Sequence, residues 1–236
     1  MSKKSKEKQE IKLNSERISI RERRIKTLKL VLLISLLFLI SIYFILRVVY
    51  ANGAFTVSLD EDFSKKSGII IFESLEQKES RRVLEAQRLE NMDNISMNWI
   101  PQNIDTEAEG GHNGPNYIAY TFYVQNQGSK PVNYWYQVVI DDIIKGVDEA
   151  IRVMVYQNGE RKIYAKLNSN GNPEENTTPF YSDKYLLVEQ RQNIGVDEID
   201  KYTIVIWLEG DDPDCVDAII GGEMKMHLEI TEEHKE

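Results

Sequence analysis

The sequence predicts a mainly β fold, an antiparallel β-sandwich preceded by a single apolar helix. Three observations predict it in a chain of 236 residues: one apolar run near the start, many short β-prone segments after it, and a change of charge between the two regions. Residues 1–29 carry eleven Lys and Arg against four Asp and Glu, whereas the remainder carries eighteen against thirty-four. We expect one or two short surface helices beside the strands.

The apolar run, residues 30–51, is predicted to be a transmembrane signal-anchor helix. Leu30–Leu46 contains no charged residue, and Arg47 is the only charge before Ala51. At 1.5 Å per residue, about 17–21 residues span roughly 26–32 Å, close to the hydrocarbon thickness of a bilayer. A core helix of this length would have a polar face. Cleavage near Ala51 by a signal peptidase is the alternative, but the long basic head favours an uncleaved anchor.

Basic residues beside the run predict its orientation. Arg24, Lys26 and Lys29 crowd its N-terminal end, which the positive-inside rule keeps in the cytoplasm. Residues 1–29 are therefore expected to form a basic cytoplasmic tail, and residues 52–236 an extracellular domain at the cell membrane. Membrane topology already explains the basic charge of residues 1–29, so no nucleic-acid partner is predicted. The predicted partner is the membrane, through residues 30–51.

The domain at 52–236 contains short segments rich in β-branched and aromatic residues, separated by turn residues, as is typical of a sandwich. The expected strands are Ala54–Leu59, Gly68–Phe72, Tyr117–Val124, Val132–Ile140, Ile151–Tyr156, Arg161–Ala165, Tyr185–Glu189, Tyr202–Leu208 and Glu223–Ile230. The last of them alternates apolar and polar residues with period two, which predicts one buried face.

Two hairpins are expected among these strands. Tyr117–Val124 and Val132–Ile140 are predicted to pair across a polar turn. Ile151–Tyr156 and Arg161–Ala165 flank Asn158-Gly159, a two-residue turn signal, because both residues tolerate a positive φ.

A helix is expected near residues 74–92, where Leu75, Leu84 and Leu89 form a thin apolar stripe among charges. Asp141–Ala150 is expected to be a short helical or turn connection. Both elements would lie on the surface of the sandwich.

The acidic segment after the strand Tyr202–Leu208 is the candidate site. Carboxylates spaced along a loop can gather around a hard cation such as Ca²⁺. The candidate metal ligands are Glu209, Asp211, Asp212, Asp214 and Asp217. Their spacing is not that of an EF-hand, and a turn with an aspartate capping a following helix is the competing interpretation.

The sequence lacks the common motifs of hydrolysis and nucleotide chemistry. The sequence contains no His-Glu-x-x-His pair, no Gly-x-Ser-x-Gly elbow and no phosphate-binding Gly-Lys-Ser/Thr loop. Cys215, the single cysteine, has no catalytic partner that the sequence indicates. We therefore expect no enzyme and no catalytic or cofactor-binding residue, and a metal-dependent hydrolase is retained only as an alternative.

Several stretches of the domain resemble a known family. They are Gly53–Leu59, Tyr120–Val124, Asn126–Gly128, Tyr134–Ile140, Trp207–Asp211 and Gly221-Gly222. Over about residues 54–230 the chain resembles the TasA/camelysin-like exported proteins of Gram-positive bacteria. The resemblance implies a jelly-roll-like sandwich at the cell surface; members build biofilm matrix fibres, and camelysin has been described as a casein-cleaving metalloprotease. No protease ligand can be transferred to a position here.

The chain departs from that pattern in its long basic head, its uncleaved apolar run and the added helix near 74–92. An anchored subunit cannot diffuse into a polymer, so free fibre assembly is not expected. The expected function is a membrane-anchored surface module with a structural or protein-binding role, partnering another protein or itself through sheet edges, with Ala54–Leu59 as a possible donor strand. The alternative is a single-pass component of a secretion or conjugation assembly.

Overall fold

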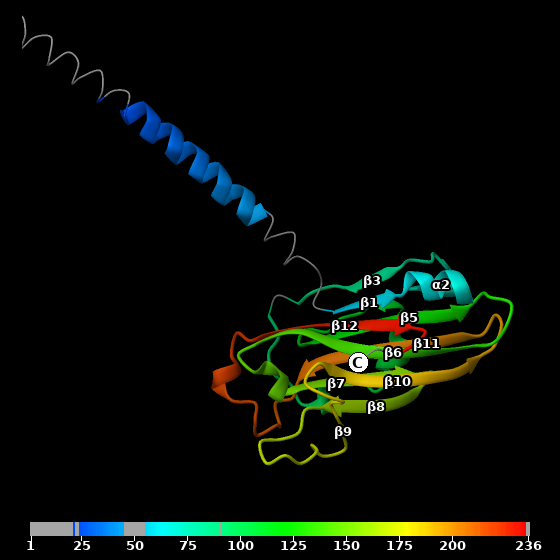
Figure 1. The fold of residues 1–236 in the computed structure, drawn as a ribbon. Coiled ribbons are helices and arrows are strands. Elements are labelled where there is room, and N and C mark those ends of the chain that lie inside the picture. Colours follow the sequence, from blue (N-terminus) through cyan, green and yellow to red (C-terminus); the bar gives the residue numbers. More distant parts are fainter. Residues whose placement is uncertain (1–20, 22–23, 45–54, 90, 235–236) are drawn as a thin grey trace, which may run out of the picture. The chain divides into compact units, whose positions relative to one another are not determined.

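The computed structural model describes residues 21, 24–44, 55–89 and 91–234, and the chain divides into two units, Met1–Asn52 and Gly53–Glu236 (Figure 1). In the first unit a helix covers Arg24–Phe44, and its 21 residues span about 30 Å. None of its apolar window is buried. The helix begins six residues before the predicted run, because Lys and Arg are good helix formers. Residues 45–51, the candidate cleavage position Ala51 included, and most of the basic tail lie outside the described residues.

The second unit is a sandwich of two sheets, which confirms the predicted fold class. Sheet A has the order β10-β6-β12-β1-β3, and sheet B has the order β2-β5-β11-β7-β8-β9, with β4 also paired to β5. The strands of sheet A are β1 (Phe55–Leu59), β3 (Val83–Ala86), β6 (Val132–Ile144), β10 (Tyr185–Ile194) and β12 (Glu223–Thr231). Those of sheet B are β2 (Ile69–Phe72), β4 (Gly110–Gly111), β5 (Tyr117–Asn126), β7 (Ile151–Gln157), β8 (Glu160–Ala165), β9 (Thr178–Pro179) and β11 (Ile199–Leu208).

Aromatic side chains join the inner faces of the two sheets. Phe122 on β5 stacks on Tyr202 of β11 with ring centroids 5.3 Å apart, and Tyr136 of β6 meets Tyr202 edge-on at 5.1 Å. All three are buried. Edge-to-face and offset stacks of this kind stabilise a core beyond the area they bury, by about 0.5–1.5 kcal/mol each.

Sheet B is also covered on its other face. A second apolar cluster includes Ile100, Ile104 and the fully buried Trp207. The segment that supplies it carries the short helices η1 (Met97–Trp99) and α3 (Ile104–Glu107). For this reason every residue of β5 is buried, although a strand of a simple sandwich would be buried on one face only.

The predicted helix at 74–92 is wrong. Residues 83–86 form β3, which pairs antiparallel with β1, and no residue described between 74 and 92 is helical. Leu84 and Ala86 are buried while Val83 and Glu85 are exposed, which is the period-two pattern of a strand. The many charges suggested a helix face, but pairing with β1 decided the conformation, as tertiary context commonly overrides propensity.

One predicted hairpin is wrong and the other is confirmed. β5 and β6 follow each other in the chain but belong to different sheets. β7 and β8 do pair, with Gln157 opposite Glu160, and the two turn residues have positive φ, 52° at Asn158 and 87° at Gly159. That turn matches the right-handed twist of the strands.

The prediction of purely antiparallel sheets is corrected in two places. β1 runs parallel to β12 and β9 runs parallel to β8. β1 is also paired to β3 on its other side. Both edges of this strand, which was expected to act as a donor strand, are therefore hydrogen-bonded within sheet A. On β12, Met226, Leu228 and Ile230 are buried between partly exposed polar residues, which confirms the period-two prediction.

The helices of this unit are short. α2 (Glu61–Ser67) is capped by Asp60, whose carboxylate accepts the backbone N–H of Phe63 at 2.7 Å. The expected connection at 141–150 is part strand and part helix, because β6 continues to Ile144 before η2 (Val147–Glu149). A further single turn, η3 (Asp217–Ile219), precedes β12.

Candidate functional site

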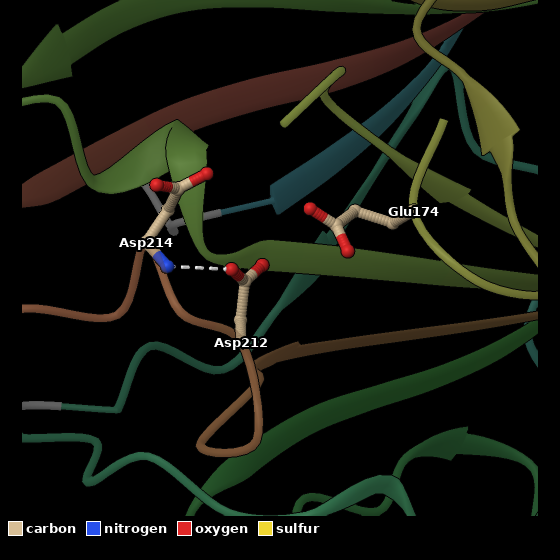
Figure 2. Close-up of side chains that lie close together, drawn as sticks. All are labelled: Glu174, Asp212 and Asp214. Atoms are coloured by element: carbon tan, nitrogen blue, oxygen red, sulfur yellow. Dashed lines mark hydrogen bonds between the residues drawn. The ribbon is translucent and has the colours of Figure 1, made fainter. Parts of the chain in front are cut away.

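Two loops at one end of the sandwich bring three carboxylates together. Asp212 and Asp214 come from the predicted acidic segment after β11, and Glu174 comes from the loop between β8 and β9 (Figure 2). One oxygen of each lies within 4.8 Å of one oxygen of each of the others. Of the five predicted ligands, the structure therefore gathers two and adds one that the sequence reasoning missed.

Local hydrogen bonds give the acidic segment its shape. The Asp214 N–H donates to Asp212 Oδ1 at 2.8 Å, and the Cys215 N–H donates to the Asp212 carbonyl at 3.0 Å. Asp214 Oδ2 accepts the Ser169 N–H at 3.1 Å, which ties the segment to the loop that carries Glu174. These contacts form a turn, which is one half of the competing interpretation. The other half is wrong, because the N-cap residue of η3 (Asp217–Ile219) is Val216 and no side chain caps that helix.

A buried arginine lies against the three carboxylates. Its contacts are with two of them: Arg152, on β7, pairs with Asp212, and its Nη2 lies 3.7 Å from Glu174 Oε2. The Arg152 side chain is 5% exposed and that of Asp212 is fully buried. One guanidinium opposes three carboxylates, so two negative charges remain when all are ionised. Burial raises the pKa of Glu174, the charge of Asp212 raises it further, and Arg152 acts in the opposite direction.

The cluster offers part of a coordination shell for a hard cation. Ca²⁺ takes six to eight oxygen ligands. The Asp212 carboxylate already pairs with Arg152 and accepts the Asp214 N–H. Glu174 and Asp214 therefore have more carboxylate oxygens available to coordinate a cation. A bound cation would offset the residual negative charge, and backbone carbonyls or water would complete the shell. The calcium hypothesis thus moves to Glu174 and Asp214 and stays a prediction.

The other three predicted ligands lie elsewhere and have structural contacts. Glu209 Oε2 accepts the Trp207 indole N–H at 3.0 Å and the Met97 N–H at 3.2 Å, which holds the segment at η1 against β11. Asp211 and Asp217 are exposed, and Asp217 begins η3. None of the three belongs to the carboxylate group of Glu174. The sequence did not indicate Glu174 as a ligand. About forty residues separate it from Asp214, and its polar loop contains no metal-binding motif.

A second polar cluster lies between the sheets and centres on Asp200, a fully buried residue of β11. Its carboxylate accepts the Tyr134 hydroxyl at 2.7 Å and pairs with Arg191 Nε at 3.0 Å. The Asn158 side chain donates to its second oxygen at 2.7 Å. Because every oxygen of this buried charge has a partner, the cluster is consistent with a structural role.

Glu189 extends this polar seam to the edges of the sheets. It lies on β10 and accepts the Tyr136 hydroxyl at 2.8 Å and Lys162 Nζ at 2.7 Å, while Tyr164 also donates to it. Burial alone would raise the pKa of Glu189, but the hydrogen bonds from Lys162, Tyr164 and Tyr136 bring it below its usual value. The ionised carboxylate therefore joins edge strand β10 of sheet A to β8 of sheet B.

Two of the histidines, His227 and His112, lie apart from these clusters. His227, on the outer face of β12, lies between Asp141 Oδ2 at 2.8 Å and Glu229 Oε1 at 3.1 Å. The hydrogen bond to Glu229, and then that to Asp141, raise its pKa to about 9 against the opposing effect of burial. His112 contacts the carbonyls of Gly110 and Ile104, which is a structural position.

No family model matches this chain, and no curated protein matches it. Among solved structures it is similar to the β-glucosidase of Kluyveromyces marxianus in complex with glucose, at 10% identity and a TM-score of 0.24, covering 71% of this chain and 15% of that one. The selenomethionine-labelled β-glucosidase from the same organism is 11% identical, with a TM-score of 0.23, and the match covers 68% of this chain and 16% of that one. The chain spans about 15% of the length of these enzymes, and likeness at such TM-scores carries no argument about activity.

Proposed function

We infer that the chain is a single-pass membrane protein whose acidic β-sandwich lies outside the cell and acts as a structural or protein-binding module. The observation that carries this proposal is the helix Arg24–Phe44, which is long and apolar enough to cross a membrane and has none of its apolar window buried. A helix that is apolar all round is stable in a protein core or in lipid, and the apolar window of this one is not buried within the protein.

The charge of the chain supports the orientation. Positive charge is concentrated in residues 1–29 and negative charge after the apolar run. Short basic segments are retained in the cytoplasm during insertion, whereas acidic residues have little influence on orientation. The sandwich then lies on the outer side.

Exposed apolar side chains on the body support a binding role. Trp99 of η1 is 74% exposed and Ile220, after η3, is 68% exposed. Exposed tryptophan is costly in water and is enriched among residues that dominate protein–protein binding energy. Trp99 is therefore our candidate contact residue on the sandwich.

Topology is tested by cysteine labelling of the full chain in cells. In a Cys215→Ser background, Asn170→Cys places a thiol in an exposed loop of the sandwich, and Ser5→Cys places a matched thiol in the basic tail. A membrane-impermeant maleimide should label Asn170→Cys on intact cells and Ser5→Cys only after lysis. Labelling of Ser5→Cys on intact cells, or protection of Asn170→Cys until lysis, would overturn the proposal.

The binding role is tested by site-specific photo-crosslinking. A photoreactive amino acid at position 99 should give a discrete adduct on intact cells, and the same group at position 170 serves as the control. The identity of the adduct separates self-association from binding to another surface protein or to a membrane-spanning assembly. Equal, diffuse adducts from both positions would contradict a specific surface at Trp99.

A further inference from the structure

The outer face of sheet A carries a socket of three aromatic rings that is occupied by a side chain of the same chain. The occupant is the imidazole ring of His234, which follows β12. The distance from its centroid to the ring centroid is 5.1 Å for Tyr185, 6.0 Å for Tyr181 and 6.1 Å for Trp135. Both tyrosines meet the imidazole nearly perpendicularly, at 78° and 82°. Tyr181 is 57% exposed, so the socket opens to solvent.

Hydrogen bonds define what the socket accepts. The Gln137 amide nitrogen donates to Glu229 Oε2 at 2.8 Å, and a carboxylate only accepts, so the amide oxygen of Gln137 faces His234. That oxygen lies 2.6 Å from His234 Nδ1, which must therefore be the donor. The socket thus presents an oxygen acceptor backed by a carboxylate, together with three aromatic rings.

The imidazole satisfies this socket only in part. His234 Nε2 is buried and has no hydrogen-bond partner, and it is the only such side-chain atom among the described residues. In neutral imidazole with Nδ1 protonated, Nε2 is an acceptor, and a buried acceptor without a donor costs about 1–3 kcal/mol. A cation in this position would instead direct N–H groups at Gln137 and at the rings, which attract cations within about 6 Å of their centroids.

We propose that the Trp135–Tyr181–Tyr185 socket is a recognition site for a cationic side chain, a guanidinium above all, on an extended segment of a partner protein, and that His234 fills it in the free molecule. Lys184 Nζ lies over the Tyr185 ring, 4.8 Å from its centroid, so this ring already has a cation beside it. Arginine fits best because its planar group both donates several hydrogen bonds and stacks on rings. The inference rests on the proposed binding role and is independent of the membrane topology.

The test uses the full chain in detergent with two labelled peptides, each repeating residues 231–233 and ending in arginine or in alanine. His234→Ala empties the socket, and it should bind the arginine peptide at least about tenfold more tightly than wild type does, and tenfold more tightly than it binds the alanine peptide. Adding Tyr181→Ala or Trp135→Ala to His234→Ala should abolish the difference. Tyr181 is largely exposed, so its variant stays informative if Trp135→Ala does not fold.

A second measurement tests the preference within the chain itself. His234→Arg should melt about 2–4 °C above His234→Gln, because the arginine satisfies the socket and the glutamine does not. Equal binding of the two peptides to His234→Ala, or equal melting of the two variants, would overturn the proposal. Either failure would leave the maleimide result, and with it the membrane topology, unaffected.

Discussion

At the scale of single residues, buried charge in this protein is paired across the chain. Arg152 of β7 meets Asp212 from the loop after β11, and Asp200 of β11 meets Arg191 of β10. In both pairs the carboxylate side chain is fully buried. A buried charge left alone costs several kcal/mol, so these pairs specify which segments come together more than they add net stability.

Removing one member of the Arg152–Asp212 pair is expected to be destabilising. Asp212→Asn should lower the free energy of unfolding by about 1.5–3 kcal/mol, because Arg152 loses its closest carboxylate and keeps only Glu174, at 3.7 Å. The apolar double variant Arg152→Met with Asp212→Leu should recover most of that loss. Denaturant unfolding of the chain measures both, with Lys65→Gln at the exposed pair to Glu61 as the control. A single variant as stable as that control would contradict this account.

The stability contributed by His227 should depend on pH. Its pKa is raised to about 9 in the folded chain, whereas histidine in an unfolded chain titrates near 6.5. The stabilisation is therefore fully present below about pH 6.5 and is lost as the pH rises to about 9. After allowance for screening at partly exposed Asp141 and Glu229 it amounts to about 1–2 kcal/mol. His227→Gln should flatten the melting temperature over this range, and an unchanged pH profile in that variant would disprove it.

The calcium hypothesis is tested at Glu174 and Asp214. If these side chains bind the cation, added Ca²⁺ should raise the melting temperature of wild type and of the control Asp217→Asn, but not that of Glu174→Gln with Asp214→Asn. The double variant should also gain stability without Ca²⁺, because it removes like-charge repulsion near Asp212. A wild-type melting temperature that is the same with Ca²⁺ and with chelator would end the hypothesis.

At the scale of elements, pairing partners decide conformation where the sequence pattern is ambiguous. Residues 83–86 form a strand because β1 presents a free edge to them, although charges surround them as on a surface helix. β5 and β6 separate into two sheets because β11 pairs with the first and β10 and β12 with the second. In each case the deciding contact comes from a distant part of the chain.

The strand conformation of β3 predicts different effects of substitution at neighbouring residues, which a surface helix would not. Ala86 is buried and Glu85 is exposed. Ala86→Lys should cost more than about 3 kcal/mol, because it buries an unpaired charge, whereas Glu85→Lys should be tolerated. Thermal unfolding of the two variants measures the difference. Equal effects would favour a surface helix, in which Ala86 lies off the apolar stripe.

At the scale of the whole molecule, β1 follows the apolar helix in the chain. It is the first strand among the described residues and lies inside sheet A, between β12 and β3 (Figure 1). Phe55 and Val57, on its inner face, are fully buried. A soluble product released near Ala51 would keep this strand, whereas a cut beyond Leu59 would remove it.

The position of β1 predicts where the chain can be shortened. A chain beginning at Asn52 should fold, because the unit from Gly53 onward has its own core. A chain beginning at Asp60 should not, because β12 and β3 would lose their common partner and the core would lose Phe55 and Val57. Circular dichroism and amide exchange distinguish the outcomes. Cooperative unfolding of the shorter chain would contradict the role of β1.

The sequence by itself determined the apolar helix, the β class and most of the strands. Period-two alternation in β12 and the Asn158-Gly159 turn are local signals, and local signals can be read without a partner. Only the tertiary structure decided the assignment of strands to sheets, the second apolar layer over sheet B, and the joining of Glu174 to Asp212 and Asp214. Those depend on contacts between residues far apart in the chain, and a single sequence carries no record of which distant segments meet.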